Sequence, residues 1–163
     1  MLLKLVGLLL LVCCGAIWGL KQLRDTVAAI ESLDALDGAL SAMEAEINLC
    51  LRPLPDIFSR LSSGKLGEIF REMAENCDIM SAGEAWGIGI EAIELPREAH
   101  KGLERLSGVL GLYDAQRQSR EIRSVRDALR GIRSGLLREK ETKKHHYPLL
   151  GACFAGIVAM III

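Results

Sequence analysis

Two glycine motifs are the first residues in this chain whose spacing could serve chemistry, because glycine-rich turns hold nucleotide phosphates. Residues 87–92 (GIGIEA) satisfy the G-x-G-x-x-A pattern of dinucleotide-binding proteins. That pattern works only between a strand and the start of a helix, whereas the spacing of Ser81 and Glu84 predicts a capping box that starts a helix just upstream. We interpret the motif as chance, or as a place where another helix approaches closely.

The second motif, Gly64-Lys65, resembles the end of a phosphate-binding loop. In G-x-x-x-x-G-K-[ST] the first position is glycine and the last carries a hydroxyl group, but Ser59 and Leu66 stand at those places. The sequence therefore predicts no nucleotide site, and we expect any ATP-driven work to come from a partner.

Titratable side chains are plentiful but form no catalytic pattern. His145 and His146 are adjacent, so on a helix they point in different directions and lack the usual spacing of metal ligands. Carboxylates such as Glu44 and Glu46 need a pocket before they can act as an acid and base pair, and Ser, His and Asp have no triad signature. We expect no catalytic, metal-binding or cofactor-binding residue and no small-molecule substrate, so the chain is predicted not to be an enzyme.

The five cysteines do not form a disulfide framework. No pair of Cys13, Cys14, Cys50, Cys77 and Cys153 has C-x-x-C spacing, and their number is odd. Both features are typical of reduced thiols that face the cytosol.

Five arginines could form a binding surface because they recur every three or four residues, which places them on one flank of a helix. This arginine flank consists of Arg120, Arg123, Arg126, Arg130 and Arg133. It could dock an acidic partner or anionic lipid. The alternative, which we weigh equally, is a solvated face paired with the domain's own acids, because residues 21–115 hold 17 acids and nine bases whereas residues 116–146 hold four acids and ten bases. Nucleic acid is not an expected partner, because the chain has only seven aromatic residues to stack on nucleobases.

The elements that position these residues lie between two apolar runs at the ends of the chain. Residues 5–20 and 147–163 contain no charged side chain, and a helix needs about 17 to 20 apolar residues to cross a bilayer core. We predict transmembrane helices at residues 1–20 and 147–163, which flank a polar domain of residues 21–146.

The basic residues beside the two runs predict the orientation. Lysine or arginine stands at positions 21, 24, 138, 140, 143 and 144 on the domain side, whereas only Lys4 lies on the other side. Positive residues stay on the cytoplasmic side of a membrane, so the domain is predicted to be cytoplasmic and the chain to lie in the cell membrane against lipid. A cleaved secretory or lipoprotein signal around Cys14 is the alternative, but it would put these bases on the wrong side of the second span.

Small residues in both predicted spans favour helix packing. Gly15 and Gly19 have the G-x-x-x-G spacing, which lets another helix backbone approach closely. The second span offers a similar face of Gly151, Ala152, Ala155 and Gly156. These faces could pack on each other, on a partner subunit or on a second copy of the chain.

Apolar residues recur with a helical period along the polar domain and nowhere alternate like a strand for more than a few residues. We therefore predict an all-α bundle of about six helices. The first continues from the first span to about residue 51, where Pro53 and Pro55 end it, and four short helices follow at about 54–61, 66–77, 81–93 and 96–110. Gly111 ends the fourth of these, and Asp114 caps a final helix that runs into the second span.

The order of these parts resembles the stage III sporulation protein AB family of endospore-forming bacteria from end to end. The resemblance rests on ordinary residues at characteristic spacings, none of which is a catalytic signature. They are Lys4-Leu5 and Gly7; Leu40, Glu44, Glu46 and Ile47 with Pro53-Leu54; Phe70 and Met73; Ser81, Ala82, Glu84, Ala85 and Trp86; Leu110-Gly111, Asp114 and Gln118; and Leu150-Gly151 with Gly156.

This resemblance implies a subunit of the sporulation channel between mother cell and forespore, with a helical domain similar to the membrane platform protein of type II secretion systems. By that analogy the chain lies in the mother-cell membrane around the forespore and meets other stage III subunits, including the AA ATPase, from the cytoplasmic side. We predict a non-enzymatic membrane scaffold required for stage III of endospore formation. The competing prediction is a membrane-tethered helical regulator or signalling adaptor unrelated to sporulation.

Overall fold

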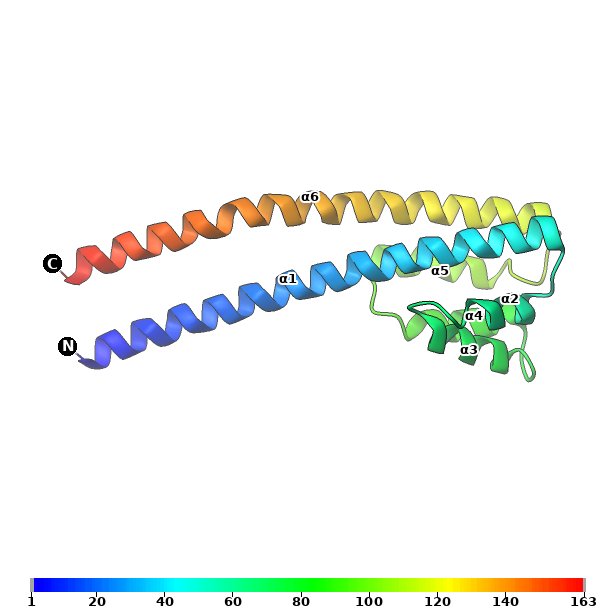
Figure 1. The fold of residues 1–163 in the computed structure, drawn as a ribbon, viewed down its shortest axis with the longest axis horizontal. Helices are drawn as coiled ribbons and strands as arrows, with labels where there is room; N and C mark the ends of the chain where they lie inside the picture. The colour runs from blue at the N-terminus through cyan, green and yellow to red at the C-terminus, as the bar shows by residue number, and fades with distance from the viewer. Residues whose placement is uncertain (1, 163) are drawn as a thin grey trace. The chain divides into compact units, whose positions relative to one another are not determined.

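The computed structural model is helical over the backbone it describes, residues 2–162, and describes the side chains of residues 21 and 24–141. Two long helices enclose four short ones along the chain (Figure 1). They are α1 (Leu2–Ala45), α2 (Leu54–Leu61), α3 (Gly67–Asn76), α4 (Ala82–Glu91), α5 (Arg97–Ser107) and α6 (Ala115–Ile162). With no strand among the described residues, the predicted all-α fold and its six helical segments are confirmed.

The chain divides into two compact units. Residues Met1–Val27 and Ser134–Ile163 form one, and Ala28–Arg133, which we call the central unit, form the other. The central unit lies inside the predicted polar domain and contains all the contacts described below.

The predicted spans at residues 1–20 and 147–163 lie outside the residues whose side chains are described. The same holds for the small-residue positions Gly15, Gly19, Gly151, Ala152, Ala155 and Gly156. Within the described part of the chain, no helix combines the length and the apolar character needed to cross a membrane. Both spans stay predictions.

In the central unit, α1 and α6 run antiparallel, with the short helices beside them (Figure 1). An apolar stripe spaced by three or four residues is buried on each long helix, as the periodicity predicts. The buried members are Ile30, Leu33, Leu36, Leu40 and Met43 on the first helix, with Ile47 in the turn directly after it, and Ile122, Val125 and Leu129 on the last helix. The stripe on α6 fades toward its C-terminal side, because Ile132 and Leu136 are only half-buried.

An aromatic cluster joins the short helices. The rings of Phe58, Phe70 and Trp86, one each from α2, α3 and α4, have centroids 6.3 to 6.4 Å apart. All three side chains are fully buried. The indole Nε1 of Trp86 donates a hydrogen bond of 3.0 Å to the carbonyl oxygen of Leu103 on α5, so the cluster satisfies its one polar group while it packs the four helices together.

Two glycines of α4 permit close helix contacts. A Cβ atom at Gly83 would lie 2.1 Å from the carbonyl oxygen of Ser107, and one at Gly89 would lie 2.2 Å from the terminal methyl group of Met73. The G-x-G-x-x-A motif lies at the C-terminal end of α4, and the contact of its second glycine with Met73 agrees with the second of our two interpretations, a place where another helix approaches closely.

The predicted capping box at the start of α4 is confirmed. The Ser81 hydroxyl accepts the amide of Glu84 at 3.3 Å, and the Glu84 carboxylate accepts the Ser81 amide at 3.0 Å. Asp114 also acts as predicted, since its carboxylate accepts the amide of Arg117 at 3.3 Å. The end predicted for α5 was wrong by one turn: the helix ends at Ser107, and the chain turns before Gly111, whose φ is +78°.

The first long helix ends in an element that the sequence did not predict. Residues Glu46–Cys50 form a π-helical turn, and Leu51 follows in the left-handed conformation with φ 48° and ψ 37°. A left-handed residue with a side chain costs roughly 1–2 kcal/mol. This turn lets the chain leave α1 and enter the Pro-rich start of α2.

Candidate interaction surface

The arginine flank lies where α6 faces α1 in the central unit. Four of its members are spaced by three, four and three residues, so their side chains leave the same side of the helix. The facing side of α1 carries Asp34, Asp37 and Glu44. Because the helices run in opposite directions, the last acid of α1 meets the first of these arginines, and the order reverses along the contact.

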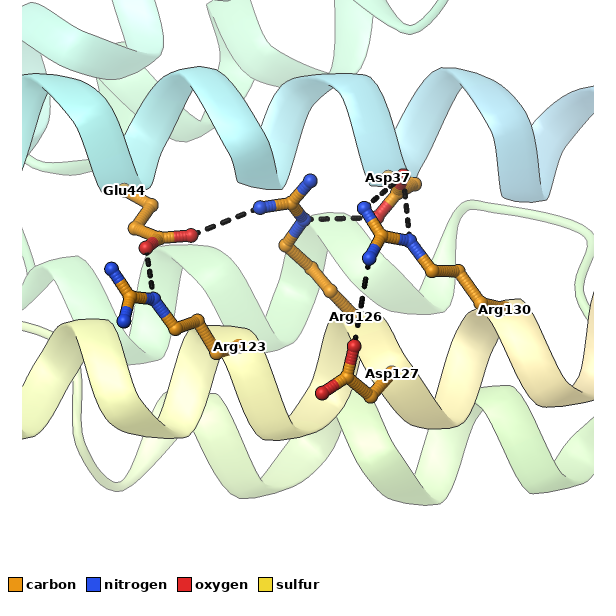
Figure 2. A network of polar contacts seen from close by, with 6 residues as sticks. All are labelled: Asp37, Glu44, Arg123, Arg126, Asp127 and Arg130. Carbon is orange, nitrogen blue, oxygen red and sulfur yellow. Dashed lines mark hydrogen bonds and ion pairs between the residues drawn. The ribbon is translucent and has the colours of Figure 1, made fainter.

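Arg126 lies at the centre of the contact (Figure 2). Its Nε donates to Asp37 and its Nη1 to Glu44, both at 2.9 Å. The side chain of Arg126 is 14% exposed and that of Glu44 only 11%. Burial alone lowers the pKa of the Arg126 guanidinium, but the two carboxylates outweigh it and raise the pKa, so this cation stays charged.

The neighbouring arginines extend the contact in both directions. Arg123 pairs with the other oxygen of Glu44, and Arg130 lies 3.3 Å from Asp37 while also reaching Asp127 on its own helix at 3.5 Å (Figure 2). Farther along, Arg133 donates to Asp34 at 3.1 Å. We call these pairs the α1–α6 ion-pair ladder.

The ladder shows which arginines of the flank are already paired with acids of the central unit. Four of the five predicted arginines pair with acids of the central unit, which is the second of the two alternatives drawn from the sequence. Arg120, by contrast, is exposed and forms no ion pair with any described residue. Docking of an acidic partner or anionic lipid on the flank stays a prediction, and Arg120 is the exposed member that no described acid pairs with.

The ladder borders an open polar pocket of about 270 Å³, lined by Glu44, Arg123, Arg126, Asp127 and Arg130. Each acid there already forms an ion pair with an arginine, and arginine is not a general base because it keeps its proton in proteins. Nor does the described part of the chain hold a group of three or more histidine, cysteine, aspartate or glutamate side chains suited to a metal ion. What the arrangement can do is fix the pairing of two helices.

Sequence reasoning found both partners of the ladder but not their pairing. From the sequence, the acids were recognised only as part of the acid-rich stretch of residues 21–115. The residue numbers could have predicted the pairing. In the pairs 44 with 123, 37 with 130 and 34 with 133, the two residue numbers add up to the same value, as they must when two helices run antiparallel.

Comparison with known proteins places the chain in a family. A family model described as stage III sporulation protein AB matches residues 4–163. A solved structure named stage III sporulation protein AB (SpoIIIAB) matches with a TM-score of 0.64 at 18% identity, over 71% of this chain and 98% of that chain, a likeness that supports the fold alone. A search of the curated proteins found no match. Because the family model covers nearly every residue, this chain belongs to the stage III sporulation protein AB family.

Proposed function

We propose that this protein is a non-enzymatic membrane scaffold in stage III of endospore formation. Membership of a sporulation family is the observation that carries the proposal. In the proposed arrangement, residues 1–20 and 147–163 are transmembrane helices in the mother-cell membrane around the forespore. The polar domain of residues 21–146 lies in the mother-cell cytoplasm.

The central unit suits a scaffold because several independent sets of contacts hold its helices in fixed positions. The aromatic cluster joins three consecutive short helices, and the ion-pair ladder joins the two long helices, which are distant in the sequence. A domain held this way can present fixed surfaces to other subunits without ordering itself on binding, which lowers the entropic cost of association.

The proposed partners follow from the family resemblance. They are other stage III subunits, including the AA ATPase, together with membrane lipid and a second copy of the chain. The small faces of Gly15 and Gly19 and of Gly151, Ala152, Ala155 and Gly156 would pack the spans on each other or on a neighbouring subunit. The channel complex of mother cell and forespore is the assembly in which we place these contacts.

Deletion of the gene tests the proposed role. We expect sporulating cells to complete engulfment of the forespore and then to arrest, and a plasmid copy of the full chain to restore heat-resistant spores. Microscopy and spore counts give the readout. Normal spore formation in the deletion strain would reject the sporulation function.

Binding of the AA ATPase tests the arginine flank. With the full chain in nanodiscs, we expect Arg120→Glu to weaken binding without changing the thermal midpoint, because this side chain has no ion pair to lose among the described residues. Arg123→Glu combined with Arg130→Glu breaks the ladder and serves as the comparison. If binding falls only in variants whose midpoint also falls, the flank is structural and the docking proposal is wrong.

A further inference from the structure

Three large apolar side chains of the central unit are exposed to solvent and line one groove. Ile79 is 80%, Ile88 52% and Leu112 69% exposed. They line a groove of about 840 Å³ between α4 and the segments that precede it and follow α5. Contiguous exposed apolar surface with a polar rim is typical of protein interaction sites.

A glycine of α4, Gly87, lines the groove. Gly87, on the exposed side of α4, would have only the Ser107 Cβ within 4 Å of an added Cβ, at 3.7 Å, so space stays open above it. Ile88 and Glu91 continue this surface along the helix. A helix of a partner can therefore approach α4 closely, as glycine surfaces allow in other helix pairs.

The rim of the groove is acidic. Glu84 and Glu91 line it, and residues 67–95 contain seven acids against a single base, Arg71. That base is occupied by Glu68 within α3. Among the described residues, Glu91 on the rim has no ion pair, and neither has Asp78, the exposed sequence neighbour of the lining residue Ile79, so the negative charge of both carboxylates stays uncompensated.

We infer that this groove binds a basic amphipathic helix of a partner protein. Its apolar face would cover Ile79, Ile88 and Leu112, and lysine or arginine residues beside that face would meet Asp78 and Glu91. Helix-in-groove recognition uses apolar anchors at one face of the helix, and complementary charge selects the partner and speeds association. The inference rests on the proposed scaffold function only in assuming that the domain receives a protein partner.

Charge argues against the other occupants. A second copy paired by a two-fold axis would set the acidic rim against itself, and the basic α6 of a second copy offers few free anchors, because its apolar stripe is buried and four of its arginines are paired. Anionic lipid headgroups would be repelled by the same carboxylates. A basic amphipathic helix of another protein matches both features, because its apolar face covers the groove and its basic residues face the acidic rim.

The test uses the full chain in nanodiscs of neutral lipid and fluorescein-labelled synthetic peptides of about 18 residues, or five helical turns. One peptide has a leucine face flanked by lysines, a second has the same face flanked by glutamates, and a third has the first composition scrambled so that no apolar face forms. Fluorescence anisotropy measures binding, and empty nanodiscs report any binding to lipid.

We expect the basic amphipathic peptide to bind and the other two to bind at least tenfold more weakly. Ile79→Ala with Ile88→Ala should raise its Kd about tenfold, and Asp78→Lys with Glu91→Lys should do the same and flatten the dependence on salt. Matched controls are Leu49→Ala, which is 83% exposed but outside the groove, and Glu98→Lys with Glu104→Lys on α5, also outside it. Neither control should change the Kd.

Three results would overturn the inference: equal binding of the acidic peptide, unchanged binding after the Ile79 and Ile88 substitutions, or self-association of the full chain that those substitutions abolish. The outcome is separable from that of the proposed function. Failure of the peptide with arrested sporulation in the deletion strain rejects the groove alone, whereas specific peptide binding with normal spores rejects the sporulation role alone.

Discussion

At the residue scale, Glu44 matters because it is buried between two guanidinium groups. Its two oxygens accept from Arg123 and Arg126, and its side chain is only 11% exposed. A partly buried carboxylate that keeps two charged partners holds both of them in place, whereas loss of its charge leaves two cations facing each other with less compensation. Stability should therefore respond to this side chain far more than to the exposed charges around it.

We expect Glu44→Gln to lower the free energy of unfolding by about 2 kcal/mol, within the range for breaking a hydrogen-bonded ion pair. Asp127→Asn is the matched control, because Asp127 is 76% exposed and, among the side chains that the structure describes, pairs only with Arg130 on its own helix, so its loss should cost less than about 0.5 kcal/mol. Thermal unfolding of the full chain in detergent, followed by circular dichroism, gives both values. Equal losses would contradict the ranking.

Two glycines should respond in opposite directions to the same substitution. Gly83→Ala would place a methyl group 2.1 Å from the Ser107 carbonyl oxygen, and backbone must move to admit it, at a cost of about 1–3 kcal/mol. Gly38→Ala meets nothing within 4 Å in the middle of α1 and should stabilise the helix by up to about 1 kcal/mol. The two melting midpoints, one lowered and one raised, check this prediction. Stabilisation by Gly83→Ala would contradict the close contact of α4 with α5.

At the element scale, the helix ends that carry a local chemical signal could be predicted from the sequence. Pro53 and Pro55, the capping box at Ser81, and Asp114 each act on backbone amides within a few residues, so their effect is visible without the fold. The π-helical turn after Ala45 carries no such signal, because an i to i+5 hydrogen bond needs no particular residue. The α5 end was missed for a related reason: Leu106 and Leu110 are both buried, and periodicity alone cannot tell a helix from the turn that follows it.

The capping box of α4 should make the stability of the domain depend on pH. Hydrogen bonds from the Ser81 hydroxyl and amide lower the pKa of the Glu84 carboxyl. A lowered folded pKa adds stability that is fully present above the ordinary glutamate pKa, about 4.3, and is lost as the pH falls through the folded value.

Ser81→Ala removes the N-cap and should cost about 1 kcal/mol at neutral pH. The difference between this variant and the original chain should shrink as the medium is acidified below the ordinary glutamate pKa, which denaturation curves at several pH values would measure. Glu72→Gln on the exposed surface of α3 is the control. A difference that stays constant across the acid range would mean that Glu84 does not take part in the cap in solution.

Over the whole molecule, the order of the helices, the arginine flank and the acid-rich stretch of residues 21–115 could be predicted from the sequence. Which acid pairs with which arginine could not. The apolar stripe on α6 and its arginines could be placed on one helix from spacing alone, whereas the partner of each arginine depends on the antiparallel register, which is a property of the packed pair. The groove could not be predicted either, because the exposure of Ile79 and Ile88 depends on which surfaces the neighbouring segments leave uncovered.

The cysteines permit a direct test of the proposed orientation. Cys50 is exposed, whereas Cys77 is half-buried, and burial together with the Asp78 charge raises the pKa of the Cys77 thiol and lowers its reactivity. In a chain whose other four cysteines are replaced by serine, we expect a membrane-impermeant maleimide to label Cys50 only after cells are permeabilised. A cysteine-free chain is the control, and labelling of intact cells would reverse the proposed orientation.

Leu51 connects the long helix to the short helices through a left-handed backbone conformation. Its left-handed backbone is one that glycine adopts without penalty, and because the side chain is 77% exposed, folding gains little from keeping a leucine there. Replacement by glycine would relieve the local strain while loosening the unfolded chain, two effects of about 1 kcal/mol that oppose each other. Leu51 can thus be replaced by glycine with little net change in the free energy of unfolding. Such a variant alters the backbone freedom of this connection and leaves the rest of the domain as it is.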